Sequence, residues 1–197
     1  GFLDTTLQPT SHLDMALNGS NLANFINQIQ LESSNADISC TTFANVIKGF
    51  SKNVTVRDIL STYPYPNTLA VLEVNKNILK LALERAASYF ENNNGNVTVS
   101  ERFLKPKVEH YNYDYFSNIN YTFDLTKEVG NRVTSIKFNG EDVLIANINE
   151  KGKLEPNMEL LNDDKYSDED KKNFNNDLSR HFQTFRTFIK YYLQDLT

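Results

Sequence analysis

The chain has 197 residues, 40% of them hydrophobic, so it can form one large domain or two small ones with a substantial core. Its formal net charge is −5 and its lysines and arginines are scattered. This excludes a basic face for duplex nucleic acid but leaves room for a single nucleotide. The only cysteine, Cys40, excludes an internal disulfide bond and a thiolate metal cluster.

The ends of the chain and its histidines suggest an excised domain without a metal site. His12, His110 and His181 are far apart and form neither an HxH nor an HxxxH pair, so we expect each to be a surface or hydrogen-bonded side chain. No apolar run reaches the roughly 20 residues of a membrane-spanning helix, and the start lacks the pattern of a signal peptide. We interpret residues 1–197 as a single domain taken from a longer protein.

The first third of the chain predicts one helix and one strand. Residues 1–18 have a mixed pattern. From Ser20, which can cap a helix, apolar residues recur at helical spacing and predict an amphipathic helix to about Leu31. The β-branched and apolar residues of 37–43 predict a buried strand, and a polar loop over 44–53 follows.

The next stretch combines a capping signal with a strand and a helix. Residues 54–60 fit either a strand or a helix, and we interpret them as a short helix because Thr55 and Asp58 form a capping-box signal. A strand over 68–74 and an amphipathic helix over 76–90 are predicted to follow.

The second half is richer in strand patterns. Residues 97–109 form a long connection with weak strand signals, and alternation over 111–125 predicts a long strand or a bent pair of strands. Residues 132–138 alternate as well, and Asn139-Gly140 is a strong hairpin signal. Another strand pair is expected over 142–161.

A long C-terminal helix is predicted from Ser167, where acidic residues favour a helix start. Its apolar stripe is more typical of a core contact than of a ligand site. The stripe comprises Phe174, Leu178, Phe182, Phe185, Ile189, Tyr192 and Leu196. Together these elements predict the α+β class, with a mixed β-sheet and flanking helices.

The run Tyr63-Pro-Tyr-Pro66 stands out among the connections. Each proline fixes its own backbone and biases the preceding residue toward an extended conformation, so Tyr65 is constrained on both sides. A ring held in this way can stack on a flat molecule. The pattern alone also fits two tyrosines that cap the core.

Several segments, taken in order, resemble one known family. They include Ser11-His-Leu-Asp-Met15, Gly19-Ser-Asn-Leu-Ala-Asn-Phe-Ile-Asn27, Ala36-Asp-Ile-Ser-Cys40, Val56-Arg-Asp-Ile-Leu60, Tyr65-Pro-Asn-Thr-Leu-Ala-Val71, Leu83-Glu-Arg-Ala-Ala-Ser88 and Arg132-Val-Thr-Ser-Ile-Lys-Phe-Asn-Gly140. Over about residues 10–140 the sequence resembles the C-terminal domain of the 5′-nucleotidase family, in particular its bacterial 2′,3′-cyclic-nucleotide 2′-phosphodiesterase/3′-nucleotidase branch.

The resemblance implies a division of labour. In the family, an N-terminal metallophosphatase domain holds two divalent metal ions, and the C-terminal domain grips the nucleoside between two aromatic rings. This sequence lacks the Asp-x-His and Gly-Asn-His-Asp metal motifs. We therefore expect a substrate-binding chain that is catalytically inert alone and holds no cofactor, within a secreted or cell-wall-attached bacterial enzyme. Its expected partners are a nucleoside or nucleotide and the metallophosphatase domain of the same polypeptide.

The resemblance assigns candidate substrate contacts residue by residue. Tyr65 occupies the position of the family's first stacking aromatic. Where the family has an Asn-Gly-Gly-x-x-Arg loop that contacts ribose and phosphate, this sequence has Thr41-Thr-Phe-Ala-Asn45, which makes Thr42, Phe43 and Asn45 positional candidates.

The second stacking ring has two alternatives. The glycine-rich loop that carries it in the family is replaced by a divergent segment, so either Tyr166 or Phe174 supplies the ring or half of the clamp is absent. A chain without the clamp would be a binding or scaffold module that contacts another domain or a surface partner. An independent hydrolase built on the adjacent Asp163 and Asp164 is a third interpretation, although such pairs are usually solvated.

Overall fold

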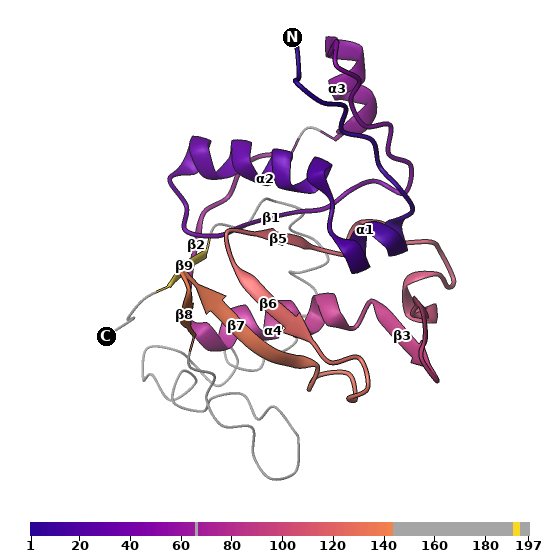
Figure 1. Ribbon diagram of the computed structural model, residues 1–197, viewed down its shortest axis with the longest axis vertical. Coiled ribbons are helices and arrows are strands. Elements are labelled where there is room, and N and C mark those ends of the chain that lie inside the picture. The colour runs from indigo at the N-terminus through magenta and orange to yellow at the C-terminus, as the bar shows by residue number, and fades with distance from the viewer. Residues whose placement is uncertain (66, 144–190, 194–197) are drawn as a thin grey trace, which may run out of the picture.

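The computed structural model describes residues 1–65, 67–143 and 191–193 and confirms the α+β class (Figure 1). The helices are α1 (His12–Asn18), α2 (Asn21–Ser34), α3 (Val56–Thr62) and α4 (Lys76–Ala87), with 3₁₀ turns η1 (Glu101–Phe103) and η2 (His110–Asn112). In this part of the chain, none of the helices has both the length and the apolar character that crossing a bilayer requires.

The strands are short and are distributed over several small sheets. They are β1 (Ser39–Thr41), β2 (Leu72–Val74), β3 (Phe90–Asn93), β4 (Asn96–Val99), β5 (Tyr115–Ser117), β6 (Asn120–Phe123), β7 (Val133–Phe138), β8 (Glu141–Asp142) and β9 (Tyr191–Leu193). The pairs β1–β5 and β3–β4 and the three-stranded sheet β6–β7–β8 are antiparallel, whereas β2 and β9 pair in parallel. The described strands therefore do not join into one mixed sheet.

Local capping signals define the helices of the N-terminal half. The Ser20 hydroxyl accepts a hydrogen bond from the Ala23 N–H at 3.2 Å, which confirms the predicted start of α2. Thr55 and Asp58 form the predicted capping box of α3. Helix α1 was not predicted, although Ser11 caps it in the same way by accepting from the Asp14 N–H at 3.1 Å.

A hairpin after α4 corrects the sequence analysis. The predicted helix over 76–90 ends at Ala87, and β3 and β4 form a hairpin where a helix end and a loop were expected. Asn94 and Gly95 both have positive φ, 55° and 91°, as a tight two-residue hairpin turn requires. Asn139 and Gly140 make the same kind of turn between β7 and β8, as predicted.

The alternating segment 111–125 is a bent pair of strands, one of the two predicted alternatives. Asn118, with a φ of 62°, lies between β5 and β6 and redirects the chain. Strand β5 pairs with β1, whereas β6 pairs with β7. This left-handed residue explains why two small sheets replace a single large one.

The C-terminal predictions fall mostly outside the described residues. Residues 144–161 of the expected strand pair and most of the expected helix from Ser167 lie outside the described residues. Residues 191–193, which were predicted to continue the helix, are instead the backbone of β9.

The core lies between the two long helices and the sheets. Helix α2 covers β1 and β5, and α4 lies against β7 (Figure 1). Tyr89 is fully buried at the centre of an aromatic cluster, with its ring centroid 5.1 Å from that of Phe103 and 4.8 Å from that of Tyr113. Such tilted and edge-to-face ring pairs add to the stabilisation that burial provides.

A buried carboxylate joins α4 to β7. Glu84, which is 4% exposed, accepts the backbone N–H of Arg132 at 2.9 Å and that of Val133 at 2.8 Å. In return, Arg132 Nη1 donates to the carbonyl oxygens of Ala87 and Phe90, at 2.9 and 2.6 Å. These contacts satisfy the carbonyl of Ala87, the last residue of α4, and that of Phe90, the first residue of β3.

Replacing this carboxylate is expected to be costly. Glu84→Ala leaves two buried N–H groups unpaired and should lower the free energy of unfolding by about 3–5 kcal/mol. Urea denaturation followed by circular dichroism measures the change. Glu32→Ala, on the exposed side of α2, is the matched control and should change it by no more than about 0.5 kcal/mol. Equal losses in the two variants would contradict the role assigned to Glu84.

Candidate functional site

The loop that leaves β1 is tied to a distant segment of the chain. The Thr42 hydroxyl donates to the carbonyl of Tyr111. Asn45 uses both ends of its amide, because Nδ2 donates to the Val108 carbonyl at 2.8 Å and Oδ1 accepts the His110 N–H at 3.1 Å. Two of the three candidate residues of this loop therefore hold the connection that precedes β5.

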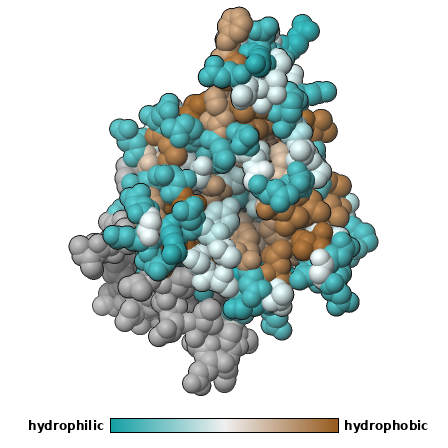
Figure 2. Space-filling model, in the orientation of Figure 1, coloured by the Kyte–Doolittle hydropathy of each residue, from teal (hydrophilic) through white to brown (hydrophobic). Residues whose placement is uncertain are grey.

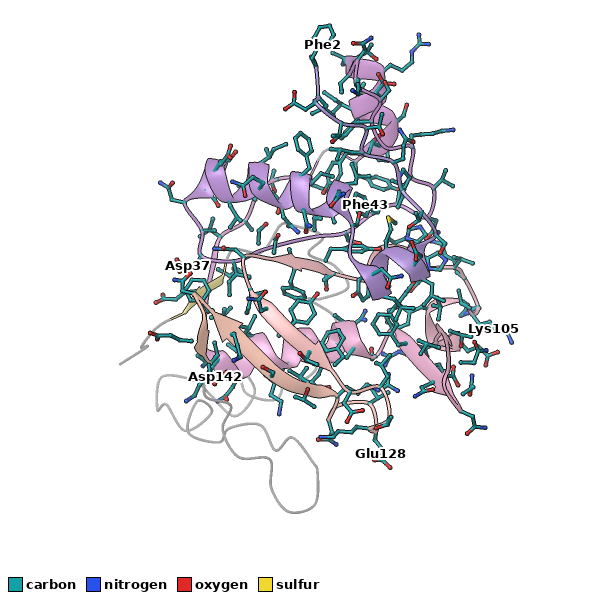
Figure 3. All side chains as sticks on the ribbon, viewed as in Figure 1. Phe2, Asp37, Phe43, Lys105, Glu128 and Asp142 are labelled. Carbon is teal, nitrogen blue, oxygen red and sulfur yellow. The ribbon has the colours of Figure 1, made fainter. Side chains whose placement is uncertain are left out.

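Phe43, the third candidate of the loop, lies in the interior (Figure 3). Its side chain is 2% exposed, and its ring centroid lies 5.4 Å from that of Tyr115. In this structure the ring contributes to the core. Among the candidates near β1, only Asn45 belongs to the exposed residues.

The two histidines of the N-terminal and central segments meet beside this loop. The rings of His12 and His110 stack with centroids 4.3 Å apart and an interplanar angle of 13°. His12 Nε2 donates to the carbonyl of Asn45 at 3.1 Å, and His110 Nδ1 lies 2.6 Å from the Tyr89 hydroxyl. The expectation of hydrogen-bonded histidines holds for this pair, but their contact was not predicted.

Burial sets the protonation of the histidine pair. It lowers the pKa of His12, and it lowers the pKa of His110 with a further contribution from the neighbouring His12. Burial also raises the pKa of Tyr89, which keeps its hydroxyl protonated and able to donate to His110 Nδ1. The pair is therefore neutral at pH 7, and two neutral rings can stack without charge repulsion.

A partly buried carboxyl group, that of Asp114, lies directly before β5 in the same segment. Burial raises the pKa of Asp114 to about 6, and Arg85 opposes that rise. The Arg85 guanidinium lies over the ring of Phe103, 5.0 Å from its centroid. Asp114 is thus a titratable group near η2 in addition to the two histidines, and it changes its charge below pH 7.

Tyr65 and Tyr63 have different environments. Tyr65 is 53% exposed, so its side chain is accessible from outside the molecule. Tyr63 is partly buried, and its hydroxyl accepts from Asn67 Nδ2 at 3.2 Å. Burial raises the pKa of Tyr63, while the side chains of Asn67 and Thr41 partly offset the shift.

The remaining candidates cannot be placed. Tyr166 and Phe174, the alternatives for a second ring, lie outside the described residues, as do Asp163 and Asp164. Among residues 1–65, 67–143 and 191–193, no group of three or more His, Cys, Asp or Glu side chains is arranged to hold a metal ion.

Residues 4–166 match the family described as 5′-nucleotidase, C-terminal domain. The trifunctional nucleotide phosphoesterase protein YfkN of Bacillus subtilis is 30% identical over 159 residues, which are 72% of this chain and 10% of that protein. A 2′,3′-cyclic-nucleotide 2′-phosphodiesterase/3′-nucleotidase of Haemophilus influenzae is 29% identical over 123 residues, which are 61% of this chain and 18% of that protein.

A solved structure is also similar. A Staphylococcus aureus protein described as a 5′-nucleotidase, crystallised in complex with alpha-ketoglutarate, superposes with a TM-score of 0.68 and 35% sequence identity. The match covers 74% of this chain and 29% of that one. The chain therefore spans less than a third of the length of each of these relatives.

The histidine pair predicts a pH dependence of stability. Because the folded-state pKa values lie below the ordinary value of 6.5, the unfolded chain binds more protons as pH falls past 6.5. The contribution of the histidine pair to the free energy of unfolding should therefore decrease from pH 7.5 toward pH 5.5. Urea denaturation of the parent and of the double variant His12→Gln/His110→Gln measures this contribution, because the parent should lose more stability over this range than the variant does.

Asp114 is present in both proteins. Its effect on the pH dependence of stability has the opposite sign to that of the histidines, because its raised pKa favours the folded state at low pH. Its contribution cancels when the variant is subtracted from the parent. Parallel curves for the two proteins would contradict a role of the stacked histidines.

Proposed function

Because the chain belongs to the family of 5′-nucleotidase C-terminal domains, we propose that it is the nucleotide-recognition domain of a bacterial phosphoesterase. The enzyme would hydrolyse phosphate esters of nucleotides as a 2′,3′-cyclic-nucleotide 2′-phosphodiesterase and nucleotidase. Two relatives, a trifunctional nucleotide phosphoesterase and a 2′,3′-cyclic-nucleotide 2′-phosphodiesterase/3′-nucleotidase, support this substrate class.

The observation that carries the proposal is the exposed ring of Tyr65. It is 53% exposed, and in the sequence it stands between Pro64 and Pro66, which restrict the backbone on either side. A pre-positioned ring loses little conformational freedom when a base stacks on it. Stacking also tolerates different bases, because every base offers a flat face.

The loop beside β1 would make a weak contact with phosphate. It has no arginine or lysine between Thr41 and Asn45. A phosphate group is usually bound by an arginine, which can donate two parallel hydrogen bonds, or by the ammonium group of a lysine. The side chains of Thr42 and Asn45 are already engaged with residues 108–111. We expect this domain to recognise the base more than the phosphate, and hence to bind a nucleoside nearly as well as a nucleotide.

Catalysis would come from another part of the enzyme. We propose that a metallophosphatase domain N-terminal to this one, in the same polypeptide, holds two divalent metal ions that activate a water and stabilise the charge on the phosphoryl group. This chain's contribution would be to fix the base at Tyr65. We further propose an extracellular location, secreted or attached to the cell wall.

A binding or scaffold module is the second candidate function. It is favoured by the loop itself, since Phe43 is buried and Thr42 and Asn45 make internal contacts. In this alternative, the domain keeps the fold but contacts a neighbouring domain instead of a nucleoside.

Nucleoside binding can be tested on the 197-residue chain. Titration with adenosine or 3′-AMP, followed by backbone amide NMR shifts near Tyr65, should show saturable binding. Tyr65→Ala should weaken it by about 1–3 kcal/mol, or roughly 5- to 150-fold, whereas Tyr65→Phe keeps the stacking face and should retain it.

Phe2→Ala is the matched control for loss of an exposed aromatic ring. Phe2 is 87% exposed and lies beside α3 at the end of the molecule (Figure 3), and its removal should leave the titration unchanged. The absence of any shift at millimolar ligand would refute the nucleoside role and favour the scaffold alternative.

The catalytic assignment has its own test. The 197-residue chain, incubated with 2′,3′-cyclic AMP or 3′-AMP and added Mn²⁺, Mg²⁺ or Co²⁺, is expected to release no phosphate and open no cyclic ester. Metal-dependent turnover that a chelator abolishes would show instead that the chain carries a catalytic site of its own.

A further inference from the structure

Helix α3 is short and stands apart from the rest of the fold. It lies with the N-terminus at one end of the molecule (Figure 1). Within the described part of the chain, no other helix or strand makes more than a marginal contact with it. Its anchors are polar, because the Thr55–Asp58 capping box holds its start and the buried Thr62 donates to the Gly49 carbonyl at 2.9 Å. A helix of fewer than about 12 residues is marginal on its own, so α3 depends on these two ends.

One side of α3 is apolar and exposed. Val56, Ile59 and Leu60 follow one another at helical spacing, which places them on the same side of the helix. Their side chains are 72%, 48% and 61% exposed. An amphipathic helix normally buries such a stripe against the core. We name these three side chains the α3 face, and an exposed apolar face of this kind is typical of a surface that another protein covers.

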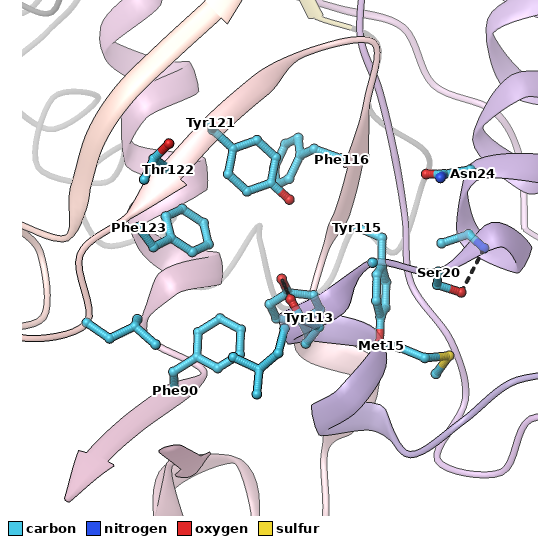
Figure 4. A pocket seen from close by; sticks show the side chains of 15 residues that line it. Met15, Ser20, Asn24, Phe90, Tyr113, Tyr115, Phe116, Tyr121, Thr122 and Phe123 are labelled. Atoms are coloured by element: carbon cyan, nitrogen blue, oxygen red, sulfur yellow. Dashed lines mark hydrogen bonds between the residues drawn. The ribbon is translucent and has the colours of Figure 1, made fainter. Parts of the chain in front are cut away.

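The other apolar area on this side of the molecule has a different explanation. Figure 2 shows hydrophobic residues gathered between α1 and β3, and the hollow in Figure 4 is lined by aromatic residues of β3, β5 and β6 and by residues of α1. Phe90, Tyr113, Tyr115 and Phe116 are buried there and pack on neighbouring rings. This area is the edge of the core and needs no partner, whereas the α3 face lacks such burial.

The N-terminal segment is fixed beside α3. The Gly1 nitrogen donates to the Val54 carbonyl at 2.8 Å, and Phe2 forms an antiparallel bridge with Asn53. In a longer polypeptide the Gly1 nitrogen would be a peptide N–H, which can make the same hydrogen bond. A polypeptide that continues before Gly1 would therefore leave this domain next to Val54, two positions before the first residue of α3.

The relatives indicate what such a continuation would contain. The matched family is described as a C-terminal domain, and this chain covers 10%, 18% and 29% of the three relatives. The proposed function places a metallophosphatase domain in that position. A domain tethered by a short linker has an effective concentration on the order of millimolar at the surface beside its tether. A small apolar surface is then sufficient to hold it.

We propose that the α3 face is the docking surface for the metallophosphatase domain that precedes this one in the same polypeptide. This inference rests on the proposed function. Its value for catalysis follows from the chain order, because α3 ends at its C-cap Tyr63, two residues before Tyr65. A domain held on the α3 face would lie close to the ring that is proposed to hold the base. The complementary surface is expected to be apolar, since the side chains of the α3 face form no hydrogen bonds.

The test compares two polypeptides. One is the 197-residue chain, and the other extends it by the domain encoded immediately before Gly1. Hydrogen exchange of the amides in residues 56–62, followed by mass spectrometry, measures how well α3 is covered. Docking should slow this exchange by at least about 10-fold in the longer polypeptide. Val56→Gln/Leu60→Gln should restore the fast exchange, because it removes two apolar side chains and introduces a residue with good helix propensity.

The matched control is Ile29→Gln/Val129→Gln. Both residues are exposed and apolar, and Val129 follows Glu128 at the opposite end of the molecule from Phe2 (Figure 3). The control should keep the slow exchange in the longer polypeptide. In the 197-residue chain, both double variants should unfold at the same urea concentration as the parent. A lower midpoint for Val56→Gln/Leu60→Gln alone would show that these side chains support the fold itself, and would overturn the proposal.

Three further results would overturn the proposal. The first is equal exchange of α3 in the two polypeptides. The second is a coding sequence without a metallophosphatase domain before Gly1. The third is a dimer of the 197-residue chain in analytical ultracentrifugation that Val56→Gln/Leu60→Gln abolishes, since a second copy would then cover the face.

The docking surface and the nucleoside role fail separately. Adenosine binding at Tyr65 without slowed exchange of α3 would refute docking and leave the nucleoside role intact. Slowed exchange of α3 in a polypeptide that does not bind adenosine would do the reverse.

Discussion

The exchange of hydrogen bonds between Glu84 and Arg132 fixes the relation between helix and sheet on which the other features depend. The carboxylate of Glu84 on α4 accepts the N–H groups of Arg132 and Val133, where the chain enters β7. The side chain of Arg132 in turn donates to the carbonyls of Ala87, the last residue of α4, and Phe90, the first residue of β3. Removing either partner would leave buried polar groups unpaired. The helix end and the strand start are therefore positioned as one unit.

The features that bear on function lie directly after this unit. Tyr89 and Phe90 follow α4, and they face different regions. The Tyr89 hydroxyl reaches His110 and thus the stacked histidines beside Asn45, whereas the Phe90 ring lies against those of Tyr113 and Phe123. The residues next to the Glu84–Arg132 contacts thereby link α4 both to the loop after β1 and to the aromatic residues of the later strands.

Sequence reasoning was most successful where the determinants are local. Ser20 and the Thr55–Asp58 box mark helix starts within four residues, and Asn139-Gly140 marks a hairpin by its backbone preference alone. Asn94-Gly95 is the same kind of signal, but the predictions of a helix over 76–90 and of a long connection over 97–109 left out the β3–β4 hairpin. Family membership was also confirmed, because it rests on many short segments in a fixed order.

The site was less predictable because its contacts are not local. The stacking of His12 on His110 joins residues 98 positions apart, so no local spacing could reveal it. The β-branched and apolar pattern that correctly placed β1 could not reveal that Phe43 turns inward while Thr42 and Asn45 bind the segment before β5.

The bonds from Thr42 and Asn45 have a consequence for the order of folding. They connect residues 63 to 69 positions apart, so the entropy of closing a long loop must be lost before either bond can form. The loop after β1 therefore depends on residues 108–111 for its native conformation. It should acquire its shape late, after α4 and the strands have assembled.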